Sequence, residues 1–197
     1  MSQFSLISAI AFAVMILSWL VFVIVFATQK KAPSAPDKKS DRSSIIGIAL
    51  QGAAYAIVWA VRRPWLTPMF PPNRSLEIAL SMLAMVLAVA SVWFCGAAFR
   101  TLGKQWSLAA RVLEGHKLVT EGPYSVVRNP IYTGMFGMLL ATGLAVSHWI
   151  GLSIAIVVFG IGTFIRVRSE EKLLREAFGA EFDEYARRVP AVIPFII

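Results

Sequence analysis

The sequence predicts an all-α integral membrane protein with five transmembrane helices. Of its 197 residues, 57% are hydrophobic and only 15% are charged, whereas soluble domains are about half apolar and about a quarter charged. The apolar residues are gathered in long runs that polar segments separate. Most Lys and Arg residues flank these runs, which is typical of proteins that cross a bilayer.

Three apolar runs in the first half of the chain are each long enough to cross a bilayer, which takes about 17–25 residues of helix. They comprise residues 4–28, 45–61 and 76–99. A secretory signal peptide begins with basic residues and has a shorter apolar core, so we expect the first run to remain as a helix. Residues 29–43 are a polar linker, and residues 62–74 hold four prolines, which predicts an irregular loop.

Two shorter apolar runs follow, at residues 131–146 and 150–165. Only three residues separate them, which predicts a tight helical hairpin. Glycines along both runs would let the two backbones approach closely: Gly134, Gly137, Gly143, Gly151, Gly160 and Gly162. A charged, amphipathic helical tail should then run from Arg166 to about Phe178, with a shorter helix at residues 181–188.

This pattern divides the chain into two units. Residues 1–99 would form three transmembrane helices with polar linkers, and residues 100–197 would hold a polar loop, the hairpin and the charged tail. Five spans with the N-terminus outside place 16 of the 19 Lys and Arg residues on the cytoplasmic side. The positive-inside rule therefore predicts that the loop of the second unit and the C-terminus face the cytoplasm.

The composition also argues against several other functions. The net charge of +8 comes from residues that flank apolar runs rather than interleave with aromatic ones, so we predict no nucleic acid partner. Cys95 is the only cysteine and lies in an apolar run, which excludes an internal disulfide and indicates a place in the core. No Cys or His cluster has metal-ligand spacing, so we predict no metal site. The sequence does not predict an oligomeric state.

Two polar segments border the hairpin and would meet at one membrane face. Arg166 and Glu170 are four residues apart and share a helix face, as a solvated ion pair or as part of a ligand site for an ammonium group. The turn-rich loop at residues 115–124 is either an interhelical connector or a cradle for a nucleoside. Asn129-Pro130 would open a helix, whose N-terminus also attracts anions.

The second half of the chain resembles the isoprenylcysteine carboxyl methyltransferase family, within a wider group of membrane methyltransferases that includes phospholipid N-methyltransferases. The resemblance covers roughly residues 102–195 and depends on the order and spacing of short pieces around the hairpin. These pieces are LGKQWS at 102–107, GHKLV at 115–119, GPYSVVRNPIYTG at 122–134, Glu170-Glu171, FGAEFDEY at 178–185, RRVP at 187–190 and PFI at 194–196.

The resemblance implies a methyltransferase that uses S-adenosylmethionine from the cytoplasm and a lipid-like acceptor from the bilayer. It assigns the cofactor to Gln105, His116, Leu118, Tyr124, Asn129, Pro130, Glu170 and Glu171. It assigns catalysis to Glu170, Arg128 and Arg188, with Arg188 near the substrate carboxylate. Arg128, Asn129 and Pro130 occupy the family's Arg-His-Pro motif, with Asn in place of His.

Asn129 can donate a hydrogen bond from its amide but cannot carry charge or shuttle a proton. A carboxylate acceptor is already ionised at neutral pH and needs no base, whereas an amine must lose a proton. Asn129 therefore favours a carboxylate acceptor, and together with the resemblance it predicts O-methylation of an isoprenylcysteine or similar prenyl thioether. The alternatives are N-methylation of an amino-headgroup phospholipid and a non-catalytic membrane scaffold.

Overall fold

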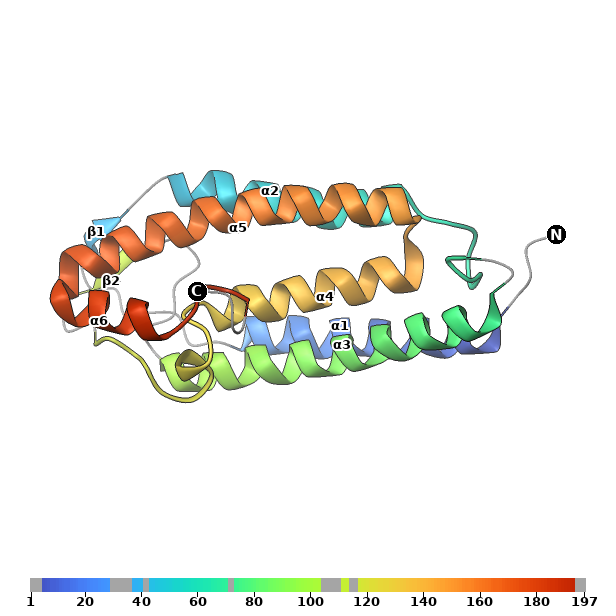
Figure 1. Ribbon diagram of the computed structural model, residues 1–197, viewed down its shortest axis with the longest axis horizontal. Helices are drawn as coiled ribbons and strands as arrows, with labels where there is room; N and C mark the ends of the chain where they lie inside the picture. The colour runs from blue at the N-terminus through green and yellow to red at the C-terminus, as the bar shows by residue number, and fades with distance from the viewer. Residues whose placement is uncertain are drawn as a thin grey trace.

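The computed structural model describes residues 5–28, 37–40, 43–70, 73–103, 111–113 and 117–193. These residues form six α-helices, a short 3-10 helix and a two-stranded ribbon (Figure 1). In chain order the elements are α1 (Leu6–Ala27), β1 (Asp37–Ser40), α2 (Ser43–Ala60), α3 (Arg74–Leu102), β2 (Arg111–Leu113), η2 (Gly122–Ser125), α4 (Pro130–Val146), α5 (Trp149–Phe178) and α6 (Ala180–Arg188). The predicted helical class is confirmed, but the antiparallel pairing of β1 with β2 is an element that the sequence pattern did not predict.

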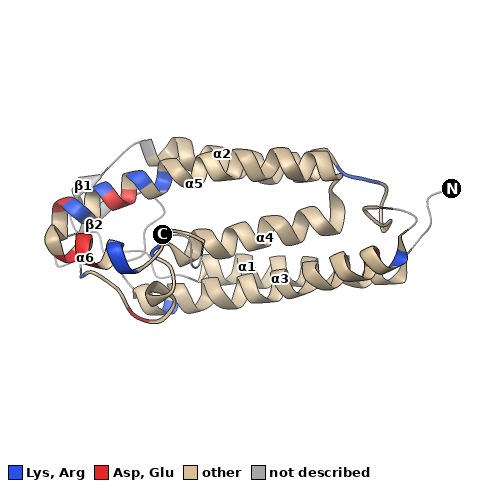
Figure 2. Ribbon diagram, viewed as in Figure 1, with Lys and Arg blue, Asp and Glu red and all other residues tan. Residues whose placement is uncertain are grey.

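The five longer helices lie side by side in an elongated bundle (Figure 1). Helix α2 packs along α5, and α4 packs along α3, which also contacts α1. The loop between α2 and α3 lies at one end of the bundle, while α6 and the ribbon lie at the other (Figure 1). Most charged residues that Figure 2 colours gather at the α6 end of the bundle, and the middle of the bundle has none.

Three described helices, α1, α3 and α5, are long and apolar enough to cross a membrane. Helices α2 and α4 are apolar as well but shorter. The integral membrane character is thus supported, while the count of five spans and their orientation stay predictions. Helix α5 has 30 residues, so the apolar run and the charged tail that follows it form one continuous helix. Gly179, with a φ of 55°, ends α5 and allows the turn into α6.

The tight hairpin predicted for α4 and α5 is not confirmed, because most of its glycines face other helices. Only Gly143 lies against the partner helix, where an added Cβ would overlap the side chain of Leu152. The other glycines have different surroundings: Gly134 and Gly137 face α3, Gly162 faces α2, Gly151 faces Val61 just after α2, and Gly160 has no atom within 4 Å of an added Cβ. The small residues do allow close helix packing, but in the pairs α3–α4 and α2–α5.

Polar side chains inside the bundle join helices that are distant in sequence. Gln51 of α2 donates a hydrogen bond of 2.9 Å to the Thr163 hydroxyl of α5. The Tyr55 hydroxyl donates to the Met135 carbonyl of α4 at 2.7 Å. Such bonds satisfy polar groups that would be costly in an apolar environment. Cys95 is fully buried, as its apolar surroundings in the sequence predicted.

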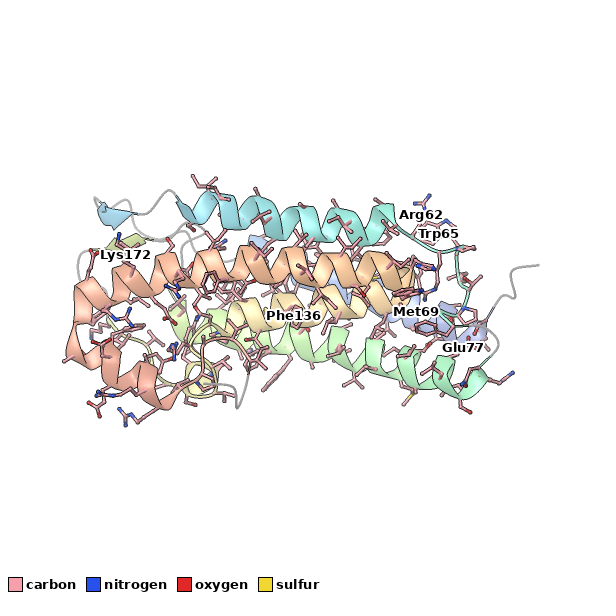
Figure 3. The ribbon with its side chains drawn as sticks, turned by 45° about the horizontal axis from the view of Figure 1, so that its top comes forward. Arg62, Trp65, Met69, Glu77, Phe136 and Lys172 are labelled. Carbon is pink, nitrogen blue, oxygen red and sulfur yellow. The ribbon has the colours of Figure 1, made fainter. Side chains whose placement is uncertain are left out.

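At the end of the bundle opposite to Lys172, Arg62 and Trp65 lie together in the loop after α2 (Figure 3). The next residue, Arg63, points its guanidinium at the C-terminal end of α4. It donates to the carbonyls of Leu144, Ala145 and Ser147 at 2.6 to 2.8 Å. A positive charge is favourable there because the last carbonyl groups of a helix lack partners and carry partial negative charge.

Replacing Arg63 with Met should therefore destabilise the protein by about 3 kcal/mol, because several carbonyl groups lose a charged donor. Thermal melting of the purified protein in detergent measures the effect. The matched control is Arg62→Met, in which only an exposed cation–π contact with Trp65 is lost, worth about 1 kcal/mol or less. Equal melting temperatures for the two variants would contradict this role for Arg63.

Candidate functional site

The candidate site lies at the charged end of the bundle (Figure 2). Four segments meet there: the loop that contains η2, the start of α4, the second half of α5, and α6 with the residues that follow it. Helix α5 brings its charged residues to this end because it continues without a break beyond its apolar run.

Glu170 of α5 is held by two side chains that contact the same carboxylate oxygen. The Tyr132 hydroxyl, at the start of α4, donates a hydrogen bond to Oε1. The Arg166 guanidinium lies 3.2 Å from Oε1 and 5.0 Å from the centre of the Tyr132 ring. Arg166 is only 5% exposed, so the pair is not the solvated ion pair that its spacing also allowed. The Glu170 side chain remains 27% accessible, which leaves it open to a ligand.

Glu171, the next residue, has a different cation partner. Its carboxylate lies 2.9 Å from Nε of Arg128, and both side chains are mostly buried. Nη1 of Arg128 also donates to the carbonyl of Ala186 at 2.7 Å and to that of Val189. One guanidinium therefore connects the loop before α4 to α5 and to the end of α6.

The residues after α6 cross the start of α4 and are held there through their carbonyl groups. The backbone nitrogen of Arg128 donates to Pro190 at 2.8 Å. Asn129 donates to the Ala191 carbonyl twice, from its backbone nitrogen at 2.9 Å and from its amide at 3.0 Å. We define residues 189–193 as the tail segment. This bond uses one N–H of the Asn129 amide, and an amide group has a second N–H and an oxygen acceptor that can contact a ligand.

Tyr124 lies in η2 and is buried. Burial, followed by the charge of Glu170, raises the pKa of the Tyr124 phenol above its usual range. Its carbonyl accepts a hydrogen bond of 2.6 Å from the Tyr185 hydroxyl of α6. Leu118 packs against the apolar cluster of α6 that contains Tyr185. The loop and α6 are therefore joined both by apolar packing and by a hydrogen bond.

The structure brings five of the ten predicted site residues together at one point and leaves others apart. Arg128, Asn129, Pro130, Glu170 and Glu171 meet where α4, α5 and the tail segment converge. Arg188 is the outlying residue, since its side chain is 70% accessible and pairs with Glu184 on α6 at 3.2 Å. Gln105 and His116 lie outside the described residues. Among the residues that the structure describes, no group of His, Cys, Asp or Glu could hold a metal ion.

Two residues with central contacts, Tyr132 and Tyr185, were not predicted from the sequence. Tyr132 follows Asn129 by three residues, so a helix that starts at Pro130 places both at the same end of α4. That spacing was a usable signal for Tyr132. Tyr185 has no comparable signal, because its hydroxyl partner is a backbone carbonyl 61 residues away in sequence.

Replacing Tyr185 with Phe should destabilise the protein by about 1 kcal/mol, because the buried Tyr124 carbonyl loses its donor. Burial raises the pKa of Tyr185 to about 12, with Arg128 opposing and Glu171 adding to the shift. The stability that the protonated hydroxyl contributes is thus present below the unfolded pKa of about 10 and is lost as pH rises towards the folded value. Melting curves at about pH 8 and about pH 11 should show the difference between wild type and variant shrinking. A difference that stays constant would contradict this assignment.

The sequence of this chain matches a known protein family. Residues 78–181, more than half of the chain, match the sequence model of the family described as Phospholipid methyltransferase (PEMT). The chain belongs to the phospholipid methyltransferase family. The residues that match the family include Glu170 and Glu171 of α5, their partners, and Tyr124 in η2. Those partners are Arg128, Tyr132 and Arg166.

Individual relatives of this family member carry different names. The chain is 32% identical over 120 residues to protein-S-isoprenylcysteine O-methyltransferase B of Arabidopsis thaliana, covering 60% of this chain and 58% of that protein. It is 34% identical over 120 residues to protein-S-isoprenylcysteine O-methyltransferase of Saccharomyces cerevisiae, covering 59% and 49%. It is also 36% identical over 110 residues to the nickel-cobalt-cadmium resistance protein NccN of Alcaligenes xylosoxydans xylosoxydans, covering 54% and 50%. The chain spans about half the length of these curated relatives.

Proposed function

We propose that this protein is a membrane methyltransferase that uses S-adenosylmethionine to O-methylate the carboxylate of an isoprenylcysteine or a similar prenyl thioether. The observation that carries the proposal is the position of Glu170. Its carboxylate is held by Tyr132 and Arg166 at the charged end of an apolar bundle and is still partly accessible. Family membership and the names of two relatives support the type of reaction and the acceptor.

The residues around Glu170 fit the cofactor. A carboxylate that two neighbours already hold in place suits the amino group of the cofactor, because less side-chain freedom is lost on binding. We propose that Tyr124, Leu118 and Pro130 supply apolar surface beside it. Pro130 opens α4 two residues before Tyr132. Both Leu118 and the Tyr124 carbonyl contact α6. When bound, S-adenosylmethionine supplies a methyl group on a positively charged sulfur. We propose that these residues bind and orient it, with Gln105 and His116 as further candidates.

The acceptor carboxylate is ionised at neutral pH, so no residue has to remove a proton from it. What the protein has to supply is alignment, which contributes up to about 7–11 kcal/mol to barrier reduction. We propose that Arg188 orients the acceptor carboxylate. Its ion pair with Glu184 is exposed on both sides, and such pairs are weak enough to open for a ligand. The lipid-facing helices would admit the prenyl chain from the bilayer.

The distribution of charge supports one orientation of the protein in the membrane. We propose that the N-terminus lies outside and that the α6 end of the bundle faces the cytoplasm, since cytoplasmic loops carry an excess of Lys and Arg. Described residues at the α6 end include the basic residues Arg128, Arg166, Arg168, Lys172, Arg175, Arg187 and Arg188. A cytoplasmic cofactor would then have direct access to Glu170.

A second candidate function is N-methylation of a phosphatidylethanolamine-type lipid, which the description of the family favours. An amine acceptor has to lose a proton during the reaction. Glu170 is the residue that we would assign as its base, because its carboxylate is partly accessible. In that reaction Glu170 would contact the acceptor in addition to the cofactor.

The two functions can be separated with the purified protein and S-adenosylmethionine labelled on its methyl group. An N-acetylated S-prenylcysteine and phosphatidylethanolamine are offered as acceptors in separate reactions. The proposal expects label in the prenylcysteine and its release by mild base, as from a methyl ester. Base-stable label in the phospholipid would favour the second candidate. If the protein neither binds the cofactor nor transfers the methyl group, both proposals are wrong and a non-catalytic scaffold is favoured.

A further inference from the structure

Helices α2 and α5 lie side by side along their length (Figure 1), and they approach closely where two glycines face each other. A Cβ on Gly47 of α2 would lie 2.7 Å from the carbonyl oxygen of Gly162 in α5. A Cβ on Gly162 would in turn lie 2.9 Å from the carbonyl oxygen of Gly47. Both distances are too short for real contacts, so neither position accepts a side chain unless the helices move apart.

The space left by Gly47 is filled by the side chain of Arg166. A Cβ on Gly47 would overlap Cγ of Arg166 and lie 3.4 Å from its Cδ. Arg166 is only 5% exposed, so its aliphatic part has little room to lie elsewhere. The missing side chain at Gly47 is therefore what lets the Arg166 stem lie between the two helices.

The other end of Arg166 belongs to the candidate site. Its guanidinium lies 3.2 Å from Oε1 of Glu170 and 5.0 Å from the centre of the Tyr132 ring. An arginine side chain has many rotamers, and fixing its stem reduces the number that the head can adopt. A change at Gly47 would therefore be transmitted along the side chain to the carboxylate of Glu170.

We propose that Gly47 is a positioning residue for the Glu170 site and acts through the side chain of Arg166. Gly47 lies on α2, outside the residues 78–181 that match the family. The first half of the chain would thus contribute to ligand binding as well as to the membrane bundle. This inference rests on the proposed function, because it takes Glu170 as a residue that binds the cofactor.

Calorimetric titration with S-adenosylmethionine tests the proposal on the full-length protein in detergent. Gly47→Ala should weaken binding about tenfold, the loss expected when one charged hydrogen bond is misplaced. The matched control on the same helix is Gly52→Ala, since an added Cβ there meets no atom within 4 Å. Its affinity should stay within about twofold of wild type. Wild-type affinity for Gly47→Ala would overturn the inference.

A double-mutant cycle with Arg166→Ala separates positioning from a general loss of packing. If Gly47 acts through Arg166, the double variant should bind the cofactor no more weakly than Arg166→Ala alone. Losses that multiply would show that Gly47 acts by another route and would overturn the inference. If Gly47→Ala is too unstable to titrate, the melting curves of the same cycle decide. The clash of the new Cβ with the Gly162 carbonyl is common to Gly47→Ala and the double variant, and Arg166→Ala relieves only the overlap with Cγ. A double variant more stable than the two single effects predict supports the inference, and effects that simply add overturn it.

The wild-type titration distinguishes failure of the proposed function from failure of the inference about Gly47. If wild type does not bind the cofactor, the proposed function is wrong and this inference falls with it. If wild type binds and Gly47→Ala binds equally well, only the inference is wrong.

Discussion

Replacing Glu170 with Gln should weaken the binding of S-adenosylmethionine about 10-fold to 100-fold. The substitution keeps the size of the side chain and an oxygen that accepts from Tyr132, but it removes the negative charge. A hydrogen bond to a charged group is worth about 1.5–3 kcal/mol, and each 1.4 kcal/mol corresponds to about a factor of ten in affinity. Calorimetry on the purified protein measures the effect directly, and methyl transfer at saturating acceptor should fall in parallel.

The matched control for this variant is Glu181→Gln, which removes the same charge from an exposed position on α6. We expect Glu181→Gln to bind the cofactor like wild type, because solvent screens a charge at the surface. A similar loss of cofactor affinity in both variants would mean that binding depends only on the overall charge at the α6 end of the bundle. Unchanged affinity in Glu170→Gln would show that the cofactor is not held by this carboxylate.

The helices could be predicted from the sequence because each is a local pattern. Apolar runs bounded by Pro, Gly and charged residues gave ranges that differ from α1 and α4 by only one or two residues at either end. The partners of the helices could not be predicted in the same way. Gly134 and Gly162 mark places of close approach, but a glycine in a sequence does not indicate which backbone it faces. Here the partners are α3 and α2 rather than the neighbouring helix of the hairpin.

The same limit applies to the candidate site. The spacing of Arg166 and Glu170 predicted that they share a helix face, and they do form an ion pair. The burial of Arg166 depends on α2, more than 100 residues earlier in the chain. The spacing of Arg166 and Glu170 therefore does not tell whether their ion pair is buried or exposed to solvent. Asn129 shows a further limit, because its amide contacts a backbone carbonyl. Every residue has a backbone carbonyl, so the residue type at position 191 gives no sign that this carbonyl will accept a hydrogen bond.

Replacing Arg128 with Met should have the largest effect on stability, a loss of about 3–5 kcal/mol, because it leaves the carboxylate of Glu171 buried without its cation. The same guanidinium also holds the Ala186 and Val189 carbonyls, so the tail segment should loosen. Trypsin should then cut faster after Arg187 or Arg188, the last two residues of α6, which directly precede the tail segment. Melting curves and timed digestion of the purified protein measure the two effects separately.

Two comparisons show whether this loss comes from the connection that Arg128 makes. Arg175→Met breaks an ion pair with Asp183 of 2.7 Å whose two side chains are about half accessible, and such pairs contribute about 1 kcal/mol or less. Adding Glu171→Gln to Arg128→Met should restore part of the stability, because the unpaired carboxylate is then gone. It should not restore resistance to trypsin, since the carbonyls of Ala186 and Val189 still lack their donor. If digestion of Arg128→Met proceeds at the wild-type rate, the tail segment is held by its backbone hydrogen bonds to Asn129 and not by the guanidinium.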